Sequence, residues 1–166
     1  MNKKTLTVIV LSLLVIIGLA TIWYWQTNPE RQIKKTLALM AELGSSPVGE
    51  SPIAKALKAK KLGGYFLPNA FIEWPGDEII PAGRWTGREN IIQQVLAAKN
   101  SANYQVSVDN PSIESERRNR DATAEFILVV REGANTTWAW LGVARFLKDG
   151  QRWSVTRLTF TPILRR

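Results

Sequence analysis

The sequence contains neither cysteine nor histidine among its 166 residues. Without cysteine the chain has no disulfide, no thiolate nucleophile and no cysteine-based metal site. Without histidine it lacks the commonest general base and the commonest metal ligand, so catalytic triads that need histidine are excluded. Carboxylate chemistry stays open, and we expect no cofactor and no metal site.

Acidic residues are also in the minority. Lys and Arg number 22 against 14 Asp and Glu, which gives a formal net charge of +8. Nucleic acid binding needs a continuous basic stripe with stacking aromatics, and most basic residues here are dispersed, so no nucleic acid partner is expected. Attraction to anionic lipid headgroups explains the charge at least as well. The local basic clusters are Lys55, Lys58, Lys60 and Lys61, then Arg117, Arg118 and Arg120, and finally Arg165 and Arg166.

A long uncharged run lies near the N-terminus, from Thr5 to Trp25. A helix of this length would be roughly 30 Å long, about the thickness of the hydrocarbon core of a bilayer. Lysines precede the run, and aromatic residues close it where an interfacial belt belongs. We therefore predict a single-pass transmembrane signal anchor. The residues expected at the membrane interface are Lys3, Lys4, Trp23, Tyr24 and Trp25.

A cleavable signal peptide is the alternative, with Leu6–Ile17 as its apolar region and Gly18-Leu19-Ala20 as its cleavage site. The uncleaved anchor is favoured because the apolar run continues to full membrane-spanning length. We predict a location in the inner membrane, with residues 1–4 in the cytoplasm, residues 5–25 as the anchor and residues 26–166 as a periplasmic domain. The lysines before the anchor favour this orientation, although basic residues soon after it nearly balance the count.

Two helices are predicted directly after the apolar run. Asn28-Pro29-Glu30 is typical of a helix start, and Gly44 is typical of a helix end. Ser51-Pro52 repeats the start signal, and Gly63-Gly64 ends the second helix.

The second helix has two expected faces. Ile53, Ala54 and Leu57 have the spacing of an apolar face that packs on the core. A basic face of this kind is usually just solvated, and lipid contact is the less common alternative. The expected polar face contains Lys55, Lys58 and Lys60.

The rest of the chain alternates in a pattern typical of strands, around one further helix. That helix is expected to begin at a capping box, Thr86 to Glu89, and to end near Asn100. Irregular connections are expected from Asp77 to Trp85 and from Asp109 to Asp121. The predicted strands are Ala70–Trp74, Tyr104–Val108, Ala122–Arg131, Thr137–Leu147 and Trp153–Phe160.

The order of these elements resembles the nuclear transport factor 2-like (cystatin-like, SnoaL-like) superfamily. The resemblance depends on Phe71-Ile72-Glu73-Trp74-Pro75-Gly76, on Thr86-Gly87-Arg88-Glu89-Asn90-Ile91 and on the late Asp149-Gly150 hairpin. It covers about Pro29 to Pro162. It implies an α+β cone of about three helices packed on a curved, mainly antiparallel sheet. Function varies widely on this fold.

Members of that superfamily with steroid isomerase activity use an aspartate base and two oxyanion donors. The corresponding positions here hold Trp74, Thr36 and Gly142, so the resemblance does not extend to that chemistry. The remaining carboxylate candidates are Glu73, Asp121 and Glu125. Glu125 could act as an acid or base if it faced the interior of the cone. The commoner outcome is that it faces solvent or pairs with Arg145 or Arg157 across the sheet.

The sequence is rich in tryptophan, with 7 residues. Any single tryptophan is best explained as core, but Trp85 and the others near the sheet together suit a pocket or an interface. The candidates for ligand or partner binding are Tyr65, Trp74, Phe126, Trp138, Trp140 and Trp153.

These observations predict a membrane-anchored, non-catalytic binding or assembly module. Its curved sheet would bind a subunit of a membrane complex, a second copy of the chain or a small apolar ligand. The alternative is a small-molecule lyase or isomerase that uses a pocket carboxylate such as Glu125.

Overall fold

The computed structural model describes residues 14–18, 28–76, 81–115, 120–133 and 136–163. No helix within these ranges is long and apolar enough to cross a membrane. The predicted anchor, residues 5–25, lies mostly outside the described residues, which include only its helical residues 14–18. The anchor therefore stays a prediction.

Three helices precede the last four strands of the sheet, and the first two strands lie between the second helix and the third. They are α2 (Pro29–Gly44), α3 (Pro52–Gly63) and α4 (Arg88–Ser101). The side chain of Asn28 accepts a hydrogen bond from the Glu30 N–H at 3.0 Å, and the Ser51 hydroxyl accepts one from the Ala54 N–H at 3.3 Å. These N-caps satisfy amides that have no partner within the helix. The predicted starts of α2 and α3 are confirmed.

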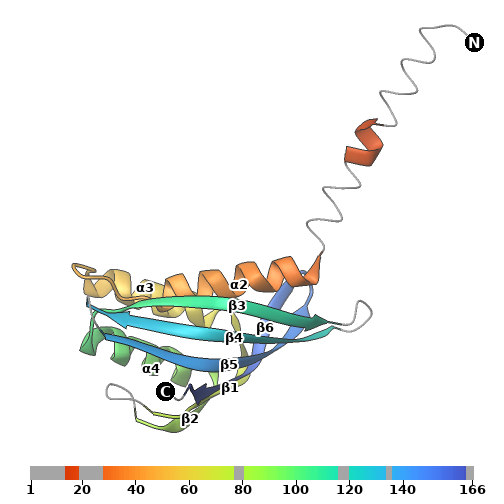
Figure 1. Cartoon of the computed structure of the whole chain (residues 1–166). Helices are drawn as coiled ribbons and strands as arrows, with labels where there is room; N and C mark the ends of the chain where they lie inside the picture. The colour runs from red at the N-terminus through yellow and green to blue at the C-terminus, as the bar shows by residue number, and fades with distance from the viewer. Residues whose placement is uncertain (1–13, 19–27, 77–80, 116–119, 134–135, 164–166) are drawn as a thin grey trace, which may run out of the picture.

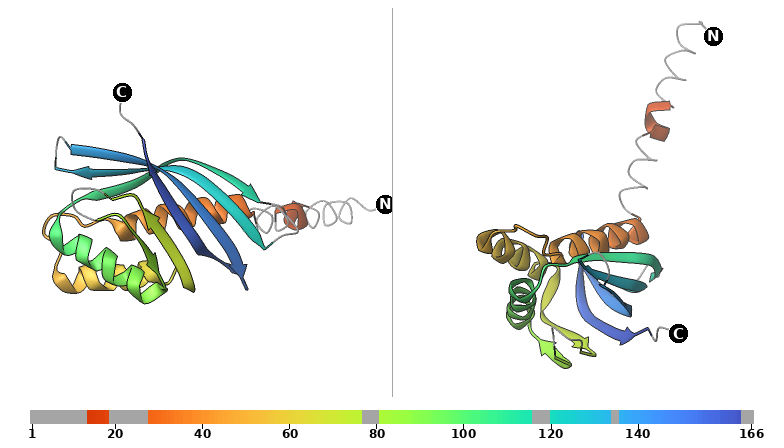
Figure 2. Two further views of the ribbon diagram at one scale, coloured as in Figure 1. Left: turned by 90° about the horizontal axis from the view of Figure 1, so that it is seen from below. Right: turned by 60° about the vertical axis from the view of Figure 1, so that its left-hand side comes forward.

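Six strands form one curved sheet in the order β2-β1-β6-β5-β4-β3 (Figures 1 and 2). The β1–β6 pair is parallel and the other four pairs are antiparallel. The predicted α+β class, with helices on a curved and mainly antiparallel sheet, is confirmed. The strands are β1 (Phe66–Trp74), β2 (Gly83–Thr86), β3 (Gln105–Ser115), β4 (Asp121–Glu132), β5 (Thr136–Asp149) and β6 (Arg152–Pro162).

The predicted capping box of α4 is wrong. Thr86 is the last residue of β2 and lies opposite Phe71 in the ladder with β1. Gly87 is the N-cap instead, with φ at 89°, and it makes no side-chain cap bond. Its N–H donates to the Ala70 carbonyl at 2.8 Å. The chain leaves the sheet at Gly87 because glycine adopts positive φ at little cost.

Both predicted irregular connections contain strand. The first contains residues 83–85 of the four-residue β2, which is a largely exposed edge strand without apolar alternation. The second contains the end of β3, which continues to Ser115 past a change of register between Asp109 and Ser112. Asn110 has a positive φ of 50° at that point. A bulge of this kind resets the alternation, so the pattern of one continuous strand is lost.

The core lies between the helices and one face of the sheet, which we call the inner face (Figures 1 and 2). Helix α2 packs on β3, and α4 packs on β1. Helix α3 packs on α2 and α4. The largest fully buried apolar side chains are Phe66, Phe146, Ile33, Ile91 and Val155.

The predicted faces of α3 are inverted in the structure. Ile53 is 74% exposed and Leu57 is 55% exposed, although both were expected to face the core. Lys55 and Lys58 turn inward, where the ammonium of Lys55 donates to the Lys99 carbonyl at 2.6 Å and that of Lys58 pairs with a Glu50 carboxylate oxygen at 2.6 Å. Only Lys60 remains on the exposed side as expected.

The inversion follows from how closely α3 approaches α4. The buried residues of α3 are Ala59, Leu62 and Gly63. A Cβ atom at Gly63 would come within 2.4 Å of the Ile92 side chain, so this glycine allows the two helices to approach. The small residues Ala59 and Gly63 set the packing face, and Ile53 and Leu57 are left on the other side.

Gly142 in β5 lies in close contact with an aromatic ring of the neighbouring strand. Gly142 lies opposite Phe126 in the β4–β5 ladder, and a Cβ atom there would come within 2.6 Å of the Phe126 ring. We expect Gly142→Ala to lower the free energy of unfolding by roughly 1–3 kcal/mol, because the buried ring must shift. Urea denaturation of the purified chain would measure this.

The matched control is Gly44→Ala at the end of α2. A Cβ atom there meets only a Val106 methyl at 3.8 Å, which is an ordinary contact. This variant should be neutral or slightly stabilising, because alanine favours the helix over glycine. Equal stability of Gly142→Ala and the wild type would contradict the packing described here.

Candidate ligand-binding site

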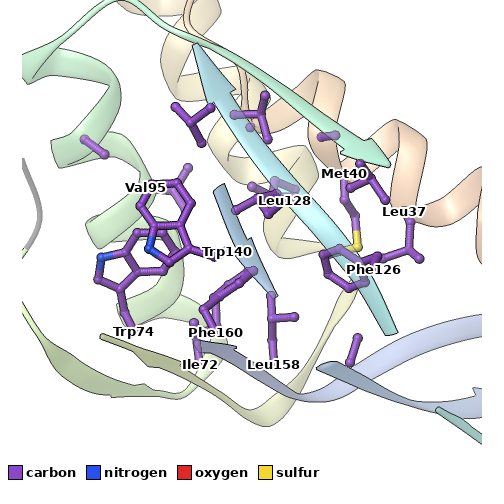
Figure 3. Close-up of a pocket in the computed structure, with 18 of the residues that line it drawn as sticks. Leu37, Met40, Ile72, Trp74, Val95, Phe126, Leu128, Trp140, Leu158 and Phe160 are labelled. Atoms are coloured by element: carbon purple, nitrogen blue, oxygen red, sulfur yellow. The ribbon is translucent and has the colours of Figure 1, made fainter. Parts of the chain in front are cut away.

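A cavity of about 180 Å³ lies between the helices and the inner face of the sheet, and it is partly open (Figure 3). Helix α2 contributes Leu37 and Met40, helix α4 contributes Val95, and the other labelled residues of the wall come from the strands. Eight aromatic side chains contribute to the wall. They are Phe66, Trp74, Trp85, Tyr104, Phe126, Trp138, Trp140 and Phe160.

Trp74 is the centre of the aromatic wall. Its ring centroid lies 5.0 Å from that of Trp140, 5.0 Å from that of Phe160 and 6.2 Å from that of Trp85. The Phe160 ring meets Trp74 edge-on at 72°. Such offset and edge contacts each contribute about 0.5–1.5 kcal/mol beyond area burial. The aromatic wall is therefore held in a fixed shape by mutual contacts.

The facing side of the cavity is aliphatic. Leu37 and Met40 project from α2 toward Phe126, as Figure 3 shows. Methionine is unbranched and adapts to irregular shapes, so this side can adjust to an occupant more easily than the aromatic wall.

The cavity wall is almost free of polar side chains. Among the described residues no Asp, Glu, Lys or Arg lines it, and Gln94 and Tyr104 are its polar members apart from the indole rings. The indole N–H of Trp74 is buried and has no hydrogen-bond partner in the described part of the chain. A buried donor without a partner costs about 1–3 kcal/mol. The indole N–H of the core residue Trp153 is likewise without a partner among the described residues, so this feature does not by itself distinguish the cavity from the core.

The structure brings four of the six predicted aromatic candidates together. Trp74, Phe126, Trp138 and Trp140 all line the cavity. Tyr65 is half-buried against the core outside the cavity. Trp153 is buried in the core, where the Lys148 ammonium lies 5.8 Å from its ring.

The carboxylate candidates lie on the opposite, outer face of the sheet. Glu73 alternates with the inward Ile72 and Trp74, and its Oε2 accepts a hydrogen bond from Arg157 at 3.0 Å. Glu125 is exposed on β4, and Asp121 is exposed at the start of that strand. Arg157, a predicted partner of Glu125, thus pairs with Glu73. No carboxylate of these three reaches the cavity.

A bulge in β6 explains why sequence alternation missed Phe160 as a cavity residue. Simple alternation puts Trp153 and Val155 on one face and Leu158 and Phe160 on the other. The β5–β6 register shifts so that Arg145 faces Arg157 while the next residue, Phe146, faces Val155. Thr156 is the extra residue, and both apolar pairs consequently face inward. We find no local signal for this bulge in the sequence.

Lys99 is a buried cation next to the cavity-lining Ala98. It is 0% exposed, and its ammonium donates to the Ser45 carbonyl. Burial lowers the pKa of Lys99 from the ordinary 10.5 to about 8, while the nearby Glu50 carboxylate opposes the shift. The backbone carbonyl of Lys99 accepts hydrogen bonds from Lys55 and Ser46, so this region joins three segments of the chain.

No family model matches the chain, and no curated protein matches it. Solved structures do. An NTF2-like protein with a cystatin-like fold from Novosphingobium aromaticivorans is 14% identical, covers 87% of this chain and 86% of its own, and has a TM-score of 0.65. A protein of unknown function with a cystatin-like fold from Nostoc punctiforme is 13% identical over 80% of this chain and 89% of its own, with a TM-score of 0.61.

A third similar structure is a candidate scytalone dehydratase from Novosphingobium aromaticivorans. It is 12% identical, covers 81% of this chain and 83% of its own, and has a TM-score of 0.57. At such identities the likeness shows the fold and nothing about function. The described domain therefore has the NTF2-like, cystatin-like fold, as the sequence resemblance implied.

The buried lysine predicts a pH dependence of stability. Between about pH 8 and 10.5 the unfolded chain binds more protons at Lys99 than the folded chain, so the free energy of unfolding should rise with pH in this window. Below it both states are protonated, and the cost of burying the charge is constant. Lys99→Met should lack this rise.

Denaturation curves at about pH 7.5 and 10 would measure the difference between the wild type and Lys99→Met. Lys35→Met, at an exposed position of α2, is the control for the loss of one lysine. If the two variants change in parallel with pH, the assignment to Lys99 is wrong.

Proposed function

We propose that this chain is a membrane-anchored, non-catalytic binding module whose cavity takes a compact, neutral and mostly apolar ligand with one or two aromatic rings. The observation that supports this most directly is the cavity itself, which has an aromatic wall and no charged side chain among its described lining residues. Ligand sites of this type are apolar with a few polar groups, as Gln94 and Tyr104 would provide.

The size of the cavity limits the ligand class. Drug-sized ligands occupy pockets of roughly 300–1,000 Å³, whereas an apolar cavity of roughly 150 Å³ can bind benzene. At about 180 Å³ the cavity favours a ligand at the small end of this range. Met40 and the opening to solvent allow some increase in size on binding.

The alternative is a lyase or isomerase that uses a carboxylate in the cavity. The outward position of Glu73 and Glu125 speaks against these two residues in that role. The likeness to a candidate scytalone dehydratase concerns the fold, and it transfers no catalytic group to this chain. Binding without chemistry is therefore the better supported proposal.

Filling the cavity should abolish ligand binding. Ala41 lines the cavity from α2, so Ala41→Leu would place three additional carbon atoms in it. Titration with naphthalene or indole, followed by NMR shifts of the tryptophan N–H signals, should show saturable binding to the wild type. We expect Ala41→Leu to weaken it at least tenfold, which corresponds to about 1.4 kcal/mol.

Ala38→Leu is the matched control, because Ala38 is exposed on the same helix. It should bind the probes like the wild type. Lack of saturable binding to the wild type, or equal binding to Ala41→Leu, would contradict the assigned cavity. Turnover of a bound probe analogue would instead support the enzyme alternative.

The anchor is the second part of the proposal, and the uncharged run from Thr5 to Trp25 supports it. The intact chain should stay in the membrane fraction after a high-pH carbonate wash. Leu14→Arg with Val15→Arg should release it, since each charge at the centre of a span costs about 2.5–3.5 kcal/mol. A soluble wild-type form that begins near Thr21 would contradict the anchor and support a cleaved signal peptide.

The outer face of the sheet is where we propose that a protein partner or a second copy would bind. Leu141 is 42% exposed there, and Ile163 just after β6 is 40% exposed. These two partly exposed aliphatic side chains are the apolar surface that such a partner would cover. Light scattering of the detergent-extracted chain would test this, and a monomer without companions would count against it.

A further inference from the structure

The exposed face of α3 presents apolar and basic side chains in one stripe. Ile53 and Leu57 are one helical turn apart, and Lys60 and Lys61 follow at three and four residues from Leu57, so all four lie on the same side of the helix. All four are exposed, and Val48 in the preceding turn is 85% exposed. We call this set of five residues the α3 stripe.

Packing within the domain does not explain the α3 stripe. The two lysines in the last turn could serve only to offset the helix dipole, as basic residues at helix C-termini often do. That explanation does not account for Ile53 and Leu57. These apolar side chains are exposed to solvent in the domain, and only a binding partner would bury them. The chain meanwhile turns Lys55 and Lys58 inward onto the Lys99 carbonyl and Glu50. In α3, therefore, two lysines make contacts within the domain while two aliphatic side chains, Ile53 and Leu57, face solvent.

We infer that the α3 stripe docks on the surface of an anionic lipid bilayer. Helices that lie at a membrane interface combine apolar side chains, which enter the headgroup region, with Lys and Arg, which attract anionic lipids. An acidic protein would match the lysines, but the large exposed aliphatic side chains at helical spacing fit a lipid surface better.

The position of α3 in the chain suits this partner. This inference rests on the anchor proposed above. The proposed anchor ends at Trp25, four residues before Pro29, and four extended residues span at most about 14 Å. The start of α2 would therefore lie close to the bilayer. Helix α2 has 16 residues, about 24 Å in length, and α3 lies beyond its far end along the same edge of the domain (Figure 1). A tethered domain meets the bilayer at high effective concentration, so a modest stripe is sufficient.

The absence of cysteine from the chain makes a direct test simple. The full chain with Leu57→Cys, carrying an environment-sensitive fluorophore, is reconstituted into vesicles of phosphatidylcholine, with or without phosphatidylglycerol. We expect brighter, blue-shifted emission and quenching by spin-labelled lipid when phosphatidylglycerol is present. A label at Glu125→Cys, on the outer face of the sheet, should give the same emission with and without phosphatidylglycerol.

The lysines of the α3 stripe are tested in the same assay. Lys60→Gln with Lys61→Gln should lower the ratio of docked to undocked domain roughly tenfold or more, and high salt should reduce the wild-type signal toward this level. Arg131→Gln with Arg145→Gln removes the same charge from exposed positions on the outer face and should have little effect. An equal loss in both double variants would overturn the inference, because net charge alone would then explain it.

Flotation of the vesicles separates failure of the anchor from failure of the docking. A chain that does not float with the vesicles overturns both proposals. A chain that floats, but whose label at position 57 gives the same emission with and without phosphatidylglycerol, overturns the docking alone. An acidic protein is then the candidate for the α3 stripe.

Discussion

The parallel pairing of β1 with β6 is the constraint on which the site depends. It places Ile72 beside Leu158 although these residues lie far apart in the sequence. Trp74, at the end of β1, consequently reaches both Phe160 of β6 and Trp140 of β5. Without this pairing the aromatic wall would be split between two parts of the chain. Parallel neighbours need a long crossover, and here α4 and the strands β2 to β5 lie between them.

Local features of the fold were predictable from the sequence because their causes are local. The caps at Asn28 and Ser51 depend on side chains within three residues of the amides that they bind. Alternation located β4 and β5, whose inner residues include Phe126 and Trp140. The α+β class followed from the order of elements. No local pattern in the sequence predicts the parallel pairing of β1 with β6. The curved-sheet architecture was therefore predictable only through the resemblance to a known superfamily.

Other features depend on partners that the sequence pattern does not identify. The exposed Ile53 and the half-buried Lys55, which donates to the Lys99 carbonyl, follow from the close approach of α3 to α4 at Gly63. The number of tryptophans is a visible feature of the sequence, but whether they fill a core or surround a cavity depends on how the strands curve. The registers at Asn110 and Thr156 likewise depend on the neighbouring strand.

The extra residue in β6 has a consequence for how the two faces of the sheet are related. Beyond Thr156 the strand presents Leu158 and Phe160 to the cavity and Arg157 to Glu73 outside. If the strand were one residue shorter there, every later side chain would change sides, since the period of a strand is two residues. Arg157 would then enter an apolar cavity, and Phe160 would enter water. The hydrophobic interior and the ionic exterior are thus not independent traits: a single inserted residue fixes both, and neither can be altered by deletion without exchanging the other.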